Sequence, residues 1–411
     1  MDDLTEDIVD LTIDLMGYRT TKPNQEERRE CVDRIEKYFD GVNVETCRHE
    51  VERSPSLVVT YDGTSDPEYM LHGHIDVVSV DDDETWEPQR RDGKLYGRGA
   101  ADMKGGVAAM MRLVKDLATE DRPSLGLMVT SDEETGGFDG ARHLMNEGVY
   151  DPSFALSAEP DTRGSDGIHV VHQQKGVYWV EVAAFGETAH GSRPWKGKNA
   201  VELAWEWYDA VEGMFERSDA EDAWNTTVNL GSLQGGGEFN KVPGTASLKL
   251  DIRYTDDLQP DEMLAEMLAV EGLSVETAAD VADSVEIDVS EVSAEEVGRA
   301  LDRSERPDVL VRIEDDTPAM YTDPDHEYVQ RLRDTIEPTT GHEAVVERET
   351  GASDMAFFSG NGVPCVVFGP HGDQLHKPGE HLEIESLQPF YDVVREFVTA
   401  DGDGTSPGGV R

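Results

Sequence analysis

The sequence predicts an α/β protein whose mainly parallel central sheet, with flanking helices, is interrupted by an inserted α+β module. Strand-like and helix-like segments alternate through residues 1–175, and the same alternation returns in residues 318–411. Between them, residues 176–317 contain segments in which polar and apolar residues alternate with period two, as in half-exposed antiparallel strands. Because strands that alternate with helices favour a parallel sheet, we expect the two flanking segments to form one domain and 176–317 another.

The first flanking segment is expected to begin with helices. Apolar residues follow helical spacing from Leu4 to Phe39, with an interruption at Pro23. The short apolar runs 56–61 and 69–78 are typical of buried strands. The same criteria then predict a helix after Asp102, strands over 125–134 and 154–160, and a helix over 141–148.

The inserted module is expected to contain strands over 177–186 and 245–254 and an amphipathic helix over 199–215. Its stretch 270–317 is highly acidic, lacks lysine and has few aromatic residues, which predicts an insertion or a loosely ordered segment. The last segment is expected to contain a helix over 326–337, a strand over 363–370, a helix over 385–400 and a disordered tail over 401–411.

Charge is the most unusual bulk property. The chain has 87 acidic and 36 basic residues, a net charge of −51, and the acids are spread along its whole length. Such a field repels nucleic acid and anionic membranes, so neither is an expected partner. Because dissolved salt screens this repulsion, and because the composition resembles that of proteins from salt-loving archaea, we predict that the fold is lost when salt is removed.

Cysteine usage and the N-terminus favour the cytoplasm. Cys31, Cys47 and Cys365 are odd in number and lack CxxC spacing, so neither a disulfide framework nor a thiolate zinc site is indicated. The acidic N-terminal segment lacks the basic and apolar regions of a signal peptide, and the sequence has no apolar stretch of membrane-spanning length.

Metal-ligand side chains recur where predicted strands end, the usual place for sites in open α/β sheets. The candidates are His74 and Asp76 in LHGHIDVV, Asp102 in GRGAADMKGG, Glu133 and Glu134 in SDEETGG, Glu159 in LSAEPD, and His376 in QLHKPGEH, with His371 and His381 as rivals of His376. On a strand, His74 and Asp76 would point to one side, so that the carboxylate could orient the imidazole. The adjacent Glu133 and Glu134 would project to opposite sides, one toward metal and one toward water.

Each signal taken alone has a simpler interpretation. His74 with Asp76 could be a buried hydrogen-bonded pair, Asp102 a helix N-cap, and the glutamates and His376 solvated loop residues. Taken together, nitrogen and oxygen ligands without thiolates suit zinc, cobalt or manganese. Two cations near a shared carboxylate suit hydrolysis of an acyl bond.

The motifs HGHIDVV, GRGAADMKGG, SDEETGG, SAEP and LHKPGEH closely resemble the metal-site motifs of the M20 metallopeptidase and amidohydrolase family. The resemblance implies a di-zinc peptidase-like fold, with a catalytic domain made of 1–175 and 318–411 and a lid and dimerisation domain over 176–317. It implies two zinc ions, one held by His74, Asp102 and Glu159 and the other by Asp102, Glu134 and His376. Glu133 would be the general base, Asp76 would orient His74, and the Asp102–Met103 peptide would be cis.

The same resemblance extends to expected substrate contacts. TAHGSRPWKGKNA resembles the lid segment whose histidine, here His190, stabilises the oxyanion across a homodimer. FNKVPGTASLKLDIRY and ETGASD resemble segments that bind substrate, which implies contacts from Asn240, Arg253, Ser353 and Asp354. Without the resemblance, these stretches would be interpreted as a surface loop, an antiparallel strand and a helix cap.

The implied reaction is hydrolysis of an N-acyl amino acid of the acetylornithine or succinyl-diaminopimelate type. Desuccinylases of the family usually carry paired arginines before the glycine that opens the lid, whereas Gln174 and Lys175 precede Gly176 here, so the acyl group is left open. An exopeptidase acting on short peptides is the alternative. A non-catalytic metal-binding protein on the same fold would be expected to lack a ligand or the base. A serine hydrolase would need a GxSxG elbow between a strand and a helix, whereas the one GxSxG match, GTSPG over 404–408, lies in the expected disordered tail.

Overall fold

The computed structural model describes residues 3–80, 83–118, 124–163, 167–215, 224–285, 288 and 292–400. The chain divides into two compact units, one formed by Met1–Gln174 with Met320–Arg411 and the other by Lys175–Ala319. The borders expected from the sequence, after residues 175 and 317, lie close to these limits. The predicted disordered tail, 401–411, lies outside the described residues.

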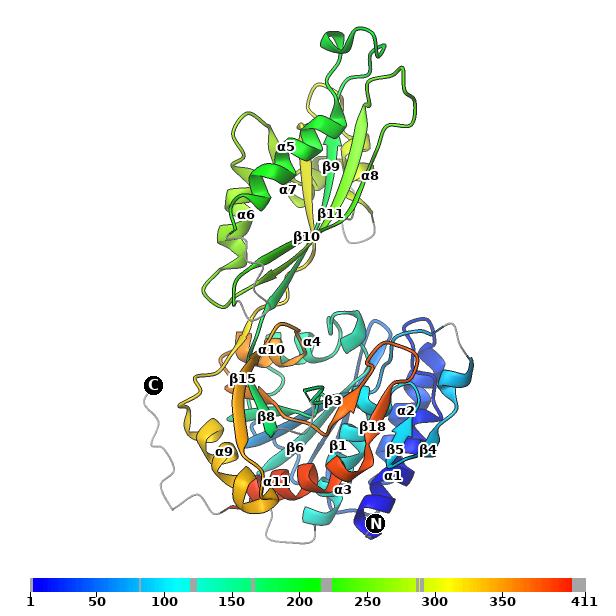
Figure 1. The fold of residues 1–411 in the computed structure, drawn as a ribbon, viewed down its shortest axis with the longest axis vertical. Coiled ribbons are helices and arrows are strands. Elements are labelled where there is room, and N and C mark those ends of the chain that lie inside the picture. The colour runs from blue at the N-terminus through cyan, green and yellow to red at the C-terminus, as the bar shows by residue number, and fades with distance from the viewer. Residues whose placement is uncertain are drawn as a thin grey trace. The chain divides into compact units, whose positions relative to one another are not determined.

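A nine-stranded sheet forms the centre of the first unit, in the order β1-β2-β6-β3-β7-β16-β8-β14, with β15 also paired to β8 (Figure 1). The strands are β1 (Glu45–Val51), β2 (Ser54–Thr60), β6 (Leu125–Thr130), β3 (Tyr69–His74), β7 (Phe154–Ser157), β16 (Cys365–Val367), β8 (Ile168–Gln174), β14 (Met320–Tyr321) and β15 (Ala344–Glu349).

The sheet is parallel at its centre and mostly antiparallel toward its edges. Strands β6, β3, β7 and β16 run parallel, whereas β1 with β2, β2 with β6, β16 with β8 and β8 with β14 are antiparallel. The expectation of a mainly parallel sheet therefore holds only for the centre. Only Glu52 and Arg53 separate β1 from β2, and so short a connection can join only antiparallel strands.

Helices cover both faces of this sheet. They are α1 (Asp3–Met16), α2 (Gln25–Tyr38), α3 (Gly105–Leu117), α4 (Ala141–Asn146), α9 (Glu327–Thr340), α10 (Met355–Gly360) and α11 (Leu387–Thr399). Adjacent strand residues face opposite sides, and the core divides accordingly. Leu71 packs in one cluster with residues of α1, α2, α3, α9 and α11, whereas its neighbour Met70 packs with residues of α4 and α10.

A second, small sheet in the first unit has the order β17-β18-β5-β4. Its strands are β17 (Gly372–Asp373), β18 (His381–Glu383), β5 (Lys94–Tyr96) and β4 (Gln89–Arg91). The antiparallel pair β18 and β5 joins segments that are far apart in the sequence, with His381 opposite Tyr96. This pairing brings the loop before β18 close to the segment that follows β5.

The second unit is built on a five-stranded sheet in the order β10-β11-β9-β13-β12. The strands are β10 (Thr227–Gly235), β11 (Thr245–Tyr254), β9 (Gly176–Phe185), β13 (Val309–Asp315) and β12 (Val275–Thr277), and all neighbours are antiparallel except β12 and β13. Residues of α5 (Ala200–Glu212) and α6 (Pro260–Leu268) pack in one core cluster, and residues of α7 (Ala278–Val285) and α8 (Ala294–Ala300) pack in another.

The acidic stretch 270–317 is more regular than its composition predicts. It contains β12, α7, α8 and β13, and a capping box between Ser293 and Glu296 opens α8. Buried alanine and valine residues such as Ala278 and Val297 supply the apolar contacts that the many acids obscure in the sequence. Residues 286–287 and 289–291 lie outside the described part of the chain.

All three cysteines are free, with Cys31 and Cys365 buried and Cys47 exposed. Among the described residues, none of the helices combines the length and the apolar character that a membrane crossing needs.

Candidate metal centre

Three neighbouring parallel strands deliver acids and a histidine to one edge of the central sheet. His74 is the last residue of β3, and β6 and β7 pair with β3 on either side. Glu133 and Glu134 follow β6 in a short 3-10 turn, η3 (Glu133–Thr135), and Glu159 lies just beyond the end of β7. The carboxyl ends of parallel strands meet at one edge, so these side chains converge although they are far apart in the sequence.

Asp102 reaches the same place from a turn that precedes α3. It lies in η2 (Ala100–Lys104), where its φ of −114° is not helical, and the Asp102–Met103 peptide is cis, as the resemblance implies. Gly106, at the start of α3, allows this helix to approach the loop that carries Glu159. A Cβ atom on Gly106 would lie 2.5 Å from the carbonyl oxygen of Ala158.

His376 comes from the loop between β17 and β18, with a φ of 60°. Its imidazole side chain is 53% exposed, whereas that of His74 is completely buried. Because β18 pairs with β5, the strand that leads toward Asp102, this loop is placed beside the Asp102 turn.

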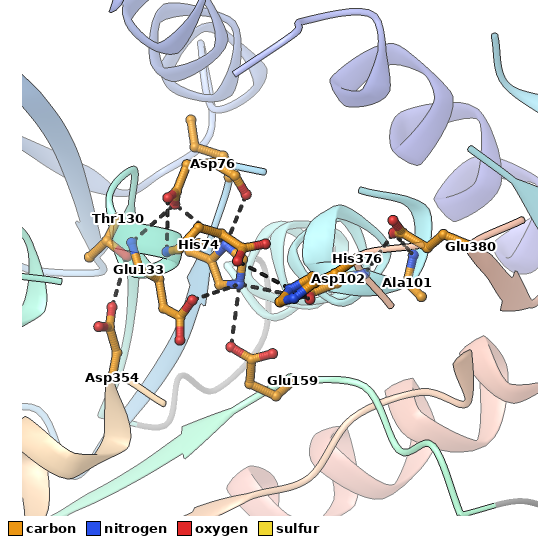
Figure 2. Close-up of polar contacts among 12 residues, drawn as sticks. His74, Asp76, Ala101, Asp102, Thr130, Glu133, Glu159, Asp354, His376 and Glu380 are labelled. Atoms are coloured by element: carbon orange, nitrogen blue, oxygen red, sulfur yellow. Dashed lines mark hydrogen bonds and ion pairs between the residues drawn. The ribbon is translucent and has the colours of Figure 1, made fainter. Parts of the chain in front are cut away.

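The five expected ligands form two groups that share Asp102, and Figure 2 labels all of them except Glu134. In the first, His74 Nε2 lies 3.2 Å from Asp102 Oδ1 and 3.4 Å from Glu159 Oε1. In the second, His376 Nε2 lies 3.0 Å from Asp102 Oδ2 and 3.1 Å from Glu134 Oε2. The donor atoms of each group lie within 4.8 Å of one another. Asp102 therefore offers one oxygen to each group.

These residues fit a pair of divalent cations. Loss of hydration on burial raises the pKa of Glu159 to about 7 and also raises the pKa of Glu134, and repulsion from neighbouring carboxylates adds to both shifts. Glu159 Oε1 is buried and has no hydrogen-bond partner among the described residues. Imidazole nitrogens and carboxylate oxygens without thiolates are ligands for zinc, cobalt or manganese, and positive charge between the groups would offset the repulsion.

Glu133 lies beside the ligand groups without belonging to either. Its Oε2 is 3.8 Å from His74 Nε2, and burial raises the pKa of Glu133 well above its usual value (Figure 2). A carboxylate with raised proton affinity, placed next to a ligand cluster, is suited to accept and return a proton near neutral pH.

Asp76 is placed differently from the expectation. Strand β3 ends at His74, so the rule that alternate strand residues share a face does not extend to Asp76. His74 Nδ1 is 3.0 Å from the backbone oxygen of Asp76 and 3.4 Å from its carboxylate Oδ1. The Asp76 carboxylate also accepts the backbone N–H groups of Glu133 and Glu134, at 3.2 and 3.0 Å. Asp76 thus contacts both the histidine and the turn that carries the two glutamates.

The prediction that Glu133 and Glu134 stand at a strand end was wrong. Strand β6 ends at Thr130, and the amide contacts with Asp76 accompany a 3-10 turn at the two glutamates. The two glutamates nevertheless point in different directions, because Glu134 faces His376 and Glu133 faces His74.

The rival histidines lie outside both ligand groups. His371 Nδ1 is 3.4 Å from Asp161 Oδ2. His381 Nδ1 is 3.0 Å from the carbonyl oxygen of Gly379, and its Nε2 is 2.9 Å from Lys94 Nζ.

Asp354, expected to contact substrate, is buried in a polar network with His72 and Thr130. Its Oδ2 accepts a hydrogen bond from Thr130 Oγ1 at 3.1 Å and lies 3.0 Å from His72 Nε2 (Figure 2). The neighbouring Ser353 is also buried and donates to Gln174 Oε1 at 2.7 Å. The resemblance did not single out His72, although its position two residues before His74 in HGH was a usable signal.

The remaining expected residues lie in the second unit. The loops that carry His190 and Asn240 are joined by a hydrogen bond from the Gly191 N–H to the Asn240 carbonyl, at 2.6 Å. His190 Nδ1 is 2.9 Å from Ser192 Oγ. Arg253, on β11, forms an ion pair with Asp251 at 2.7 Å.

The fold and the paired ligand groups are those of an α/β protein with an inserted α+β unit and a candidate site for two divalent cations. Residues 70–400 match the model of peptidase family M20/M25/M40, and the chain belongs to this family. The family expected from the motifs is thereby confirmed.

Similar proteins cover almost the whole chain. The succinyl-diaminopimelate desuccinylase of Xylella fastidiosa is 26% identical, over 96% of this chain and 99% of that protein. An uncharacterised metallohydrolase of Methanocaldococcus jannaschii is 24% identical, over 96% of this chain and 100% of that protein. The crystal structure of aminopeptidase PepT from Bacillus cereus has the same fold, with a TM-score of 0.72 at 18% identity over 96% of this chain and 98% of that one.

Proposed function

We propose that this protein hydrolyses the amide bond of N-acyl amino acids, in the manner of an acetylornithine deacetylase or a succinyl-diaminopimelate desuccinylase, with two divalent metal ions. Zinc is the first choice, and cobalt and manganese are alternatives. The observation that carries the proposal is the carboxylate of Asp102, whose two oxygens face two separate ligand groups while Glu133 stands beside them.

In this proposal, His74, Asp102 and Glu159 hold one ion, and Asp102, Glu134 and His376 hold the other. When bound, the ions supply Lewis acidity, which polarises the amide carbonyl and makes water a better nucleophile at neutral pH.

The chain's own residues handle the proton and the charge. The Glu133 carboxylate takes the proton from the attacking water and returns it to the nitrogen of the leaving amine, and its raised pKa suits both transfers. Asp76 contacts both His74 and the turn that carries Glu133, and so fixes their positions relative to each other. His190 is proposed to stabilise the oxyanion, Asn240 and Arg253 to bind the substrate's carboxylate, and Ser353 to contact the substrate.

The acyl group is the open part of the proposal. Similarity to the Xylella fastidiosa desuccinylase supports a succinyl group. Gln174, however, is a neutral residue, and its amide is already shared between Ser353 Oγ and Glu349 Oε2, at 2.7 and 3.1 Å. This arrangement supports an uncharged acyl group such as acetyl, because Gln174 supplies no cation and the ammonium group of the neighbouring Lys175 donates to the carbonyl oxygen of Asn225, at 2.6 Å.

An exopeptidase acting on short peptides is the second candidate, because the same pair of ions can activate water against either amide. The fold shared with the Bacillus cereus aminopeptidase is compatible with this candidate. Residence in the cytoplasm and a homodimer formed through the second unit, as lid and dimerisation domain, are further parts of the proposal.

The test is an activity screen of the zinc- or cobalt-loaded protein in molar salt. We expect release of free amine from N-acetylornithine or N-succinyl-diaminopimelate, faster than from any of several dipeptides. Preference for dipeptides would replace the deacylase by the exopeptidase. A folded, metal-loaded protein that cleaves none of these amides would contradict both candidates.

A further inference from the structure

A buried ion pair joins the two segments that carry Asp102 and His376. Glu380 is completely buried, Arg98 is 2% exposed, and Arg98 Nη1 donates to Glu380 Oε2. The Nε and Nη2 atoms of Arg98 have no hydrogen-bond partner among the described residues, which leaves Glu380 as the counterion of a buried guanidinium. Neither residue belongs to the two ligand groups.

The small sheet explains how the two residues meet. Arg98 follows β5 and Glu380 precedes β18, and these strands are antiparallel neighbours. The N–H of Gly97 donates to the carbonyl oxygen of Glu380 at 3.0 Å, which extends the ladder beyond the strand ends. One of these segments runs on to Asp102, and the other comes directly from His376.

The second carboxylate oxygen of Glu380 contacts the Asp102 turn. Oε1 accepts the backbone N–H groups of Ala101 and Asp102, at 3.2 and 3.3 Å (Figure 2). The backbone of Asp102 is not helical, so the turn needs an acceptor from outside itself. Glu380 therefore faces donors on both sides, with the guanidinium at one oxygen and the two amides at the other.

We propose that Glu380 is a positioning residue of the metal centre. It fixes the turn so that the two oxygens of Asp102 face the two ligand groups, and it ties this turn to the loop that carries His376. The inference rests on the metal centre of the proposed function, and it adds to that centre a residue that contacts no ion.

Replacement of Glu380 by glutamine tests the inference, because an amide has one acceptor oxygen and one donor nitrogen. With donors on both sides, Glu380→Gln must lose either the contact with Arg98 or the contact with the Asp102 turn. We expect the affinity for Co²⁺ to fall about 10- to 100-fold, as is usual when a partner of a ligand is removed. The visible absorption spectrum of the cobalt-loaded protein should change, while the circular dichroism of the metal-free protein stays native.

Glu383→Gln is the matched control. Glu383 is the last residue of β18, three residues after Glu380, and it pairs across to β5 with its Oε1 2.7 Å from Lys94 Nζ. The side chains of Glu383 and Lys94 are partly exposed, at 33% and 30%. We expect its Co²⁺ affinity to stay within about twofold of native. Equal losses in the two glutamine variants, or native affinity and spectrum in Glu380→Gln, would overturn the role of Glu380.

If Glu380→Gln does not fold, Glu380→Asp tests the positioning role of Glu380. It keeps both acceptor oxygens and the charge for Arg98, but its side chain is one methylene shorter. We expect a folded protein with a Co²⁺ affinity between those of native and Glu380→Gln, and native affinity would overturn the proposal. If the native protein binds no Co²⁺, the proposed metal centre itself is contradicted. This result separates a failure of the proposed function from a failure of the inference about Glu380.

Discussion

The two ligand groups share Asp102 but are built in different ways. His74 ends a strand at the centre of the large sheet and is completely buried. His376 lies on a loop with a positive φ and is 53% exposed. One half of the candidate centre is thus preorganised by the sheet, and the other half depends on a loop that β18 and Glu380 anchor. We expect the ion in the His376 group to exchange faster, because loops open at lower free energy than core strands do.

The largest expected effect comes from the residue that belongs to neither group. Replacement of Glu133 by alanine or glutamine should lower kcat by about 10²–10⁴-fold, because no side chain would then take the proton from water and pass it to the leaving amine. Both metal ions should remain, since Glu133 lies in neither ligand group. Single-turnover kinetics with a metal count on the same sample would check this, and turnover at the native rate would remove Glu133 from the role of base.

The comparison of the two groups is sharpened by removing one histidine at a time. His376→Ala should leave a folded protein that binds one metal equivalent, because the side chain is half exposed and contributes little packing. His74→Ala should also lower the stability of the metal-free protein, by about 1–3 kcal/mol, because it leaves buried acids without their partner. Metal stoichiometry and thermal unfolding of both variants measure the difference, and equal destabilisation would break the comparison.

The last expected effect concerns the pH dependence of stability and involves only the buried His74 group. Burial raises the pKa of Glu159 to about 7 in the folded protein, above the value near 4.3 of an unfolded chain. Ionisation of Glu159 therefore costs stability in the metal-free protein, with no cost below about pH 4 and the full cost above about pH 7. Glu159→Gln should be more stable than native by about 1–3 kcal/mol at pH 8 and equal to it at pH 4.

Urea unfolding of the chelated proteins in molar salt at both pH values measures this effect. If Glu159→Gln is no more stable than native at pH 8, as at pH 4, then Glu159 ionises in the folded protein without a cost in free energy of unfolding.

The ligand residues could be identified from the sequence because each interrupts or follows a short apolar run. His74 ends a parallel strand, Glu134 and Glu159 lie in turns that follow two others, and the glycines around Asp102 and the HKPGEH motif mark loops. The helices and most strands followed from periodicity in the same way. The antiparallel pairing at the edges of the large sheet could not be predicted from the sequence, because the direction of pairing depends on which strands become neighbours in the fold.

The residues that support the ligands were harder to predict. The sequence gives no sign that β3 stops at His74, and this stop places Asp76 against the backbone of Glu133 and Glu134. Glu380 is one of 87 acids in a chain where most acids are solvated, so nothing local indicates its burial beside Arg98. Burial of Asp354 likewise depends on His72 and Thr130, which come from distant segments.

The order of the elements along the chain constrains how the protein is made. Four of the five ligand residues precede residue 160, whereas His376 and β18 are synthesised near the end of the chain. Strand β16, which lies between β7 and β8, arrives at nearly the same time. A nascent chain can therefore bring together only the residues of the His74 group, and almost the whole polypeptide must leave the ribosome before the residues of the His376 group can meet.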